Sequence, residues 1–250
     1  MNPEEIGQRL ADAAETDRAG SGLHVRSIRG VRGSPHGVIA RVAAEAWKGG
    51  GWKLPRAEDA LNTLFGAAWE DGIVAIGLLA ASVPDRPHDA LEIARGWLDR
   101  IDDSISADAV GWLVLGPSAL ASRQDLVGLA SKLRTMPRPE TRRAAVMAAM
   151  ASLPVPIEGP AGAPLRERIG SKDVQFVEHV VPGVVGGIAD LFVRDEDPIV
   201  RKALRRVLGA WAAEDADGAT EWLEAVKGGA PRLLRDEVEK AAKKARRREA

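Results

Sequence analysis

The chain has 250 residues and no cysteine, so it has no disulfide, no thiolate metal site and no cysteine nucleophile. Its hydrophobic fraction of 45% and charged fraction of 28% are typical of a soluble globular protein, and its length is sufficient for one domain covering residues 1–250. The formal net charge of −1 argues against a uniformly basic nucleic-acid binder.

The N-terminal segment lacks the features of a targeting sequence. Glu4 and Glu5 stand where a secretory signal has basic residues. No apolar run in the sequence is expected to reach the roughly 18 residues of a membrane span. We therefore expect a cytoplasmic protein that contacts no membrane.

Apolar residues recur at helical spacing along the whole chain, in paired segments joined by short polar or proline-marked turns. Helices are expected near residues 3–17, 35–47, 58–69, 70–82, 88–101, 104–115, 123–133, 140–152, 174–192, 199–213, 220–226 and 233–248. No segment alternates with a period of two, so no strand is predicted. The sequence predicts an all-α fold.

The helical pattern is clearest at 194–211, where acids and Pro198 precede one apolar stripe. The segments P-E-T-R-R-A (139–144) and P-I-V-R-K-A (198–203) superpose, which is typical of repeated helix pairs. Such pairs stack because none can bury its apolar stripe alone. We expect an α-solenoid of HEAT-like repeats, with a Pro/Gly-rich insert at 153–164 and a basic tail at 241–250.

An ordered set of motifs in this chain resembles the AlkD-like DNA alkylation repair family. The motifs, spread over about residues 25–240, are G-V (30–31), W-E-D-G-I-V (69–74), S-I-S-A-D (104–108), T-R-R-A-A (141–145), P-I-V-R-K-A (198–203) and E-W-L (221–223). The resemblance implies a HEAT-like solenoid that holds duplex DNA on a basic concave surface. It also implies excision of cationic alkylated purines without extrusion of the damaged base into a pocket.

The resemblance assigns a catalytic role to Asp108, whose carboxylate would stabilise the positive charge that develops on the sugar. It places Arg143 on the phosphate side. The two tryptophans of the family pattern are replaced by Ser104 and Arg206 in this sequence. We therefore expect binding of double-stranded DNA with weak or absent glycosylase activity, and no cofactor.

Basic residues on the opening turns of two helices are the predicted DNA contacts. They are Arg142, Arg143, Arg201, Lys202, Arg205 and Arg206. A structural role is the alternative for each candidate: Asp108 can cap a helix, the first two arginines can bond to a neighbouring turn, and the other four can form a solvated face.

Two other functions remain open. A scaffold for protein partners is favoured by the near-neutral net charge, and a competent alkylpurine DNA glycosylase is the second alternative. The histidines at 24, 36, 88 and 179 have no ligand spacing, so no metal site is predicted.

Overall fold

The computed structural model describes residues 1–16, 27, 29–226 and 229–249. Within these ranges the chain is helical and contains no β-strand, which confirms the all-α prediction. The sequence predicts a glycine-rich loop at 19–37, of which residues 19–26 and 28 lie outside the described residues.

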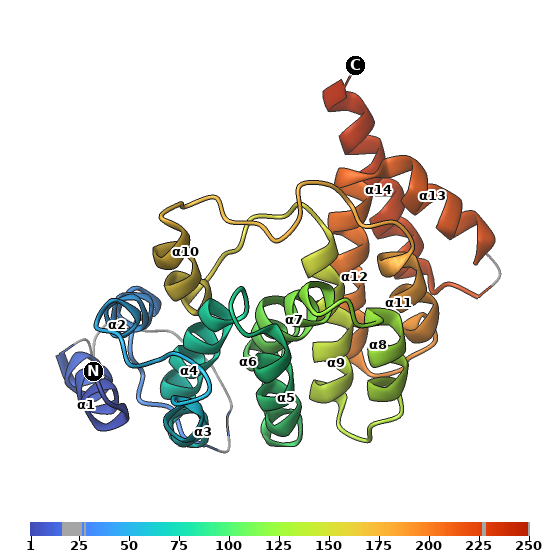
Figure 1. Ribbon diagram of the computed structural model, residues 1–250. Coiled ribbons are helices and arrows are strands. Elements are labelled where there is room, and N and C mark those ends of the chain that lie inside the picture. Colours follow the sequence, from blue (N-terminus) through green and yellow to red (C-terminus); the bar gives the residue numbers. More distant parts are fainter. Residues whose placement is uncertain (17–26, 28, 227–228, 250) are drawn as a thin grey trace.

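The α-helices follow one another along the chain, and many of their connections are short (Figure 1). They are α1 (Pro3–Thr16), α2 (His36–Lys48), α3 (Glu58–Gly66), α4 (Trp69–Ser82), α5 (Pro87–Trp97), α6 (Ser104–Val110), α7 (Gly116–Ala121), α8 (Leu126–Arg134), α9 (Pro139–Met147), α10 (Ala163–Ile169), α11 (Val184–Phe192), α12 (Pro198–Glu214), α13 (Ala216–Ala225) and α14 (Arg232–Glu249). Shorter helical turns are η1 (Leu98–Arg100), η2 (Gly111–Leu115), η3 (Ala148–Ser152) and η4 (Pro160–Gly162).

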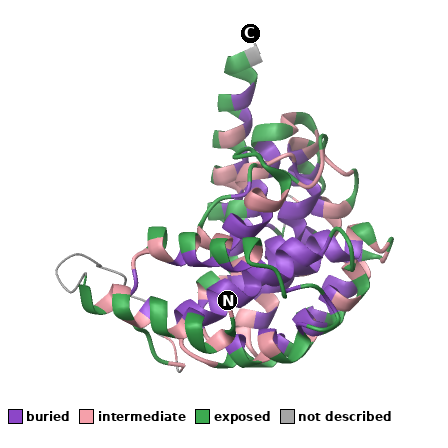
Figure 2. Cartoon of the chain, turned by 60° about the vertical axis from the view of Figure 1, so that its left-hand side comes forward, coloured by how far each residue is buried: buried purple, intermediate pink, exposed green. Residues whose placement is uncertain are grey.

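Consecutive helices pack as pairs, and the second helix of each pair also packs on the second helix of the next. The contacts run from α2 to α4, then to α6 with η2, to α9 with η3, to α12 and finally to α14. We call this continuous row of helices the second-helix layer. The apolar stripes predicted from the sequence face into this layer and its partner helices, and Figure 2 shows the buried residues along its centre.

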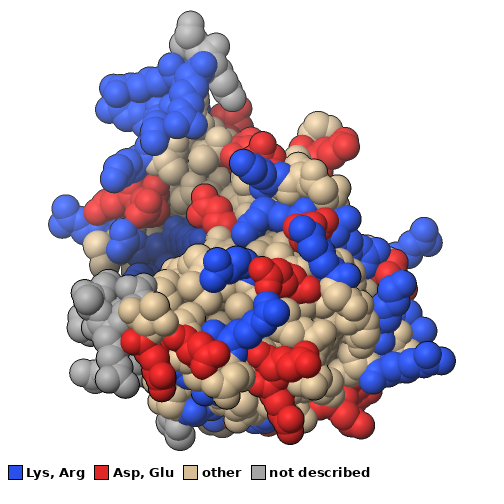
Figure 3. All heavy atoms as spheres, turned by 90° about the vertical axis from the view of Figure 1, so that its left-hand side faces the viewer, with Lys and Arg blue, Asp and Glu red and all other residues tan. Residues whose placement is uncertain are grey.

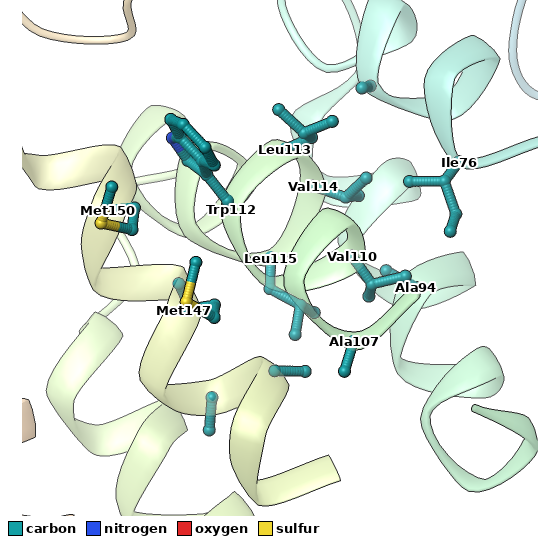
Figure 4. Close-up of a cluster of buried hydrophobic side chains, with 14 of the residues drawn as sticks. Ile76, Ala94, Ala107, Val110, Trp112, Leu113, Val114, Leu115, Met147 and Met150 are labelled. Carbon is teal, nitrogen blue, oxygen red and sulfur yellow. The ribbon is translucent and has the colours of Figure 1, made fainter. Parts of the chain in front are cut away.

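The middle of the layer is one continuous helix, because α6, the π-helical turn η2 and α7 follow without a break. Gly111 and Gly116 let this helix approach η3 and α9 so closely that a Cβ at either position would overlap a carbonyl oxygen, of Ala144 or Ala148 respectively. Figure 4 shows the side chains around this contact, including Met147. The helix was expected to end at 115, but it continues through Pro117, which follows the π-helical turn η2.

This continuous helix corrects the expectation that no apolar run reaches the length of a membrane span. By length and composition alone, the segment Ser104–Ala121 is long and apolar enough to cross a membrane, with a mean hydropathy of 1.2. However, 67% of the segment is buried inside the protein, and a core helix meets the same criteria.

The insert predicted at 153–164 is longer than expected and folds back over the first helices of the chain. It contains η4 and α10, and the helix expected at 174–192 begins only at Val184. Both η4 and α10 pack on α2 and α4, and Gly77 permits this approach, since a Cβ there would lie 2.6 Å from the Ala161 carbonyl oxygen. Every residue of α4 is buried as a result.

Most tryptophans lie where their apolar surroundings predict. The sequence places Trp69, Trp97, Trp112 and Trp211 on apolar stripes and so predicts that they lie in the core, and all four are buried. Trp52 follows the glycine run at 49–51 and is predicted to be exposed, but this prediction is wrong: its side chain is buried, and the Ser82 hydroxyl at the end of α4 donates to its carbonyl oxygen.

Two glycine substitutions test the close contact between α6–α7 and α9. Gly111→Ala places a methyl group against backbone, so we expect it to lower the free energy of unfolding by about 1–3 kcal/mol. Gly96→Ala on the exposed side of α5 meets no atom within 4 Å, and it should raise stability by about 0.5–1 kcal/mol because alanine favours a helix. Urea unfolding measures both, and equal effects of the two substitutions would contradict the packing described.

Candidate functional site around Asp108

The start of α6 places Asp108 without using it as a cap. Asp103 is the capping residue, and its Oδ1 accepts hydrogen bonds from the backbone N–H groups of Ile105 at 2.9 Å and Ser106 at 2.8 Å. The structural alternative that Asp108 caps this helix is therefore wrong. Asp108 lies more than one turn further along and has its carboxylate free for other contacts.

Asp108 forms a bidentate ion pair with Arg143 of α9. The Nε–Oδ1 distance is 2.7 Å and the Nη2–Oδ2 distance is 2.8 Å. The remaining nitrogen, Nη1, donates to the Ile199 carbonyl oxygen at the start of α12 at 2.7 Å. Arg143 is 5% exposed and Asp108 is 17% exposed, so the pair lies largely out of water.

A second arginine reaches Asp108 more loosely. Arg206 Nη1 lies 3.4 Å from Asp108 Oδ2, and the Arg206 guanidinium carbon lies 5.3 Å from the centre of the Trp112 ring. The Arg206 side chain is 47% exposed. Asp108 is thus contacted by one buried, fully bonded arginine and one half-exposed arginine.

These residues border a cavity of about 310 Å³ that we call the Trp112 cavity. It lies between α6 with η2, the N-terminal ends of α2 and α4, α12, and the turn of the insert that contains Gly159. Its lining residues are His36, Ile73, Ile105, Asp108, Ala109, Trp112, Leu113, Glu158, Gly159, Pro160, Ala161 and Arg206. The walls are mainly apolar, and the ionisable residues among them are His36, Asp108, Glu158 and Arg206.

Two buried acids at the start of α4 position the side of this cavity that is formed by His36. Glu70 accepts hydrogen bonds from the backbone N–H groups of Arg32, Gly33 and Ser34 at 2.7 to 3.2 Å. Asp71 pairs with Arg32 at 2.9 Å, and burial raises the pKa of Asp71 above its ordinary value. These bonds hold the loop that leads into α2, where His36 begins the helix.

The other predicted DNA contacts are distributed over the neighbouring turns. Arg142 bonds to Asp195 at 2.8 Å and to two carbonyl oxygens of the turn before α9, as its structural alternative expected. Arg201 donates to the Asp195 carbonyl oxygen, and Arg205 pairs with Glu237 of α14 at 2.7 Å. Lys202 is exposed on α12. Only Arg143 and Arg206 therefore meet Asp108.

Ser104 and Arg206, the positions where the family resemblance expects tryptophan, differ in their relation to the cavity. Ser104 is the first residue of α6 and does not line the cavity, whereas Arg206 does. Trp112 was assigned only to the core, and His36 and Glu158 were not predicted as site residues at all. No spacing in the sequence connects His36 or Glu158 with Asp108. The three become neighbours only through contacts between segments that lie far apart in the chain. Within the described ranges no group of three or more His, Asp or Glu side chains is arranged to hold a metal ion.

Comparison with protein-family models, with curated proteins and with solved structures found no match for this chain.

The buried ion pair predicts an asymmetric response to substitution. Asp108→Leu leaves the Arg143 guanidinium buried without its carboxylate. We expect the free energy of unfolding to fall by about 3 kcal/mol, which is the lower end of the range for buried ion pairs because Asp108 is partly exposed. Adding Arg143→Met should recover most of this loss, since both charges are then absent. Glu92→Leu, which breaks the exposed Arg95–Glu92 pair, is the control and should cost less than about 1 kcal/mol. Urea unfolding of the four proteins checks this, and a loss under about 1 kcal/mol for Asp108→Leu would show that the pair is solvated.

Proposed function

We propose that the chain is an α-solenoid of HEAT-like repeats that binds duplex DNA through its second-helix layer, with weak or absent alkylpurine glycosylase activity. The stacking of paired helices supports the repeat assignment. The superposable segments at 139–144 and 198–203 begin α9 and α12, which are neighbours in the layer.

The observation that carries the DNA proposal is a run of exposed basic residues on two adjacent helices. On α12 they are Arg201, Lys202, Arg205 and Arg206. On α14, exposed Lys240, Lys243, Lys244 and Arg247 fall at offsets 0, 3, 4 and 7, which is one face of a helix. The Arg205–Glu237 pair joins the two helices, and Figure 3 shows basic side chains crowding the projecting end of the C-terminal helix above a hollow. We call these eight residues the basic face.

A surface of this kind suits phosphates rather than bases. Phosphates require positive charge and N–H donors but no particular sequence, and the binding they support weakens steeply with salt. The acidic residues elsewhere in the chain bring the net charge near zero without removing this local excess.

The insert limits where a duplex can lie. Because η4 and α10 cover α2 and α4, the proposed contact is with the part of the layer from α9 to α14. The side chains of Arg142 and Arg143 are only 17% and 5% exposed, so the proposal gives them a supporting role and gives phosphate contact to the exposed residues of the basic face.

The surroundings of Asp108 support weak or absent excision. An unpaired carboxylate would stabilise a developing cation most strongly, but Arg143 and Arg206 already offset its charge. A competent glycosylase therefore has less support from this geometry than binding alone.

A salt titration tests the proposed contacts. If about four basic side chains contact phosphates, the slope of log affinity against log salt should be near −3.6, which is roughly a hundredfold loss between 50 and 200 mM salt. Replacing Lys202 and Arg205 by glutamine should flatten the slope by about 1.8. Arg86→Gln just before α5, combined with Arg95→Gln on α5, removes the same charge far from the basic face and should leave the slope unchanged. Fluorescence anisotropy with an undamaged duplex decides: no binding at 50 mM salt would favour the protein-scaffold alternative.

Excision is tested separately with duplex DNA that carries 7-methylguanine. We expect release of the free base close to the spontaneous rate, since the Asp108 carboxylate is offset by two arginines. Chromatography of the released base measures this, with Asp108→Asn as the matched control. Release well above the spontaneous rate that is lost in the variant would support a competent glycosylase instead.

A further inference from the structure

The Trp112 cavity has the size of a site for a small ring system. Its volume of about 310 Å³ is at the lower limit of small-molecule sites, which measure about 300–1,000 Å³. Isoleucine, leucine, alanine, proline and tryptophan side chains form most of its wall, and four ionisable residues also line it. It can enclose one flat apolar group whose polar atoms point outward, but not a large cofactor.

One face of the Trp112 ring is already covered by a cation. The planar guanidinium of Arg206 lies over the ring, with 5.3 Å between its central carbon and the ring centre. Arg206 is half exposed, and its contact with Asp108 is long at 3.4 Å. It can therefore turn outward into water without leaving a buried charge unpaired, and the ring face is then available to another planar group.

Departure of Arg206 also changes what Asp108 offers to the cavity. The ion pair with Arg143 remains, since Arg143 is buried and bonded through all three nitrogens. Oδ2 of Asp108 then keeps one bond from Arg143 and regains capacity for a second donor. A ligand that fits must place an N–H donor at this oxygen while its ring covers Trp112.

We propose that the Trp112 cavity binds a nucleobase with an exocyclic amine, which stacks on Trp112 in place of Arg206 and donates to Asp108 Oδ2. Adenine, cytosine and guanine meet this requirement, whereas thymine and uracil lack the amine. The base can come from a free nucleobase or from a DNA strand, by extrusion from the stack. The second source rests on the proposed binding of duplex DNA, and it differs from the AlkD-like pattern, in which the base is not extruded into a pocket.

A variant that fills the cavity tests the first source. Ala109 of α6 is partly buried and lines the cavity, so Ala109→Phe should occupy the space that a base would take. Ala60→Phe on α3, also a partly buried alanine, lies outside the cavity and controls for the larger side chain. Equilibrium dialysis with adenine should show binding to the natural chain and to Ala60→Phe, at least tenfold weaker binding to Ala109→Phe, and weaker binding of thymine to all three. Circular dichroism confirms that each variant is folded.

A strand is tested as the source with a short duplex that contains one central A·T pair. Extrusion of the adenine leaves its thymine unpaired, and permanganate oxidation of that thymine should rise with the natural chain and Ala60→Phe but not with Ala109→Phe. Anisotropy of the same duplex measures its binding independently.

The outcomes separate the two proposals. Loss of all duplex binding overturns the proposed function, while dialysis with adenine still tests the cavity proposal. Adenine retention without a permanganate signal identifies the free base as the source. Duplex binding with neither signal, or signals that Ala109→Phe leaves unchanged, overturns the cavity proposal.

Discussion

One buried guanidinium fixes the arrangement of three neighbouring helices. Arg143 on α9 holds α6 through two bonds to Asp108 and holds the start of α12 through the Ile199 carbonyl oxygen. A cation that is 5% exposed must be paired within the protein, because leaving it unpaired out of water costs several kcal/mol. The close approach of α6 and α9 at Gly111 allows these bonds to form. The position of Asp108, and with it one edge of the Trp112 cavity, follows from this constraint.

The insert decides which part of the second-helix layer is available to a partner. Residues in η4 and α10 cover α2 and α4, with Gly77 allowing contact at backbone distance. The covered helices lose their exposed face, and the turn around Gly159 closes one side of the cavity. The two ends of the layer therefore differ. The insert covers the helices at its start, and the basic face lies on α12 and α14 at its end.

The candidate site was predictable in part. Asp108, Arg143 and Arg206 were named from the sequence, and they do converge on one point. The roles that the geometry gives them differ, because a guanidinium bonded through all its nitrogens positions its neighbours rather than reaching a ligand. Trp112 was missed as a site residue since its apolar stripe gives the same signal as any core tryptophan. His36 and Glu158 gave no signal, because their approach to Asp108 depends on contacts between distant segments.

The sequence by itself determined most of the helices and their order, since apolar periodicity and proline-marked turns are local properties that each segment carries alone. It also determined which residues face the core, as the stripe of α12 from Val200 to Trp211 shows. Only the tertiary structure decided that the helix beginning at Ser104 continues to Ala121, that the insert folds over α4, and which acid pairs with which arginine. These features depend on backbone approach and on the burial of charge between segments far apart in the chain, and no local pattern encodes either.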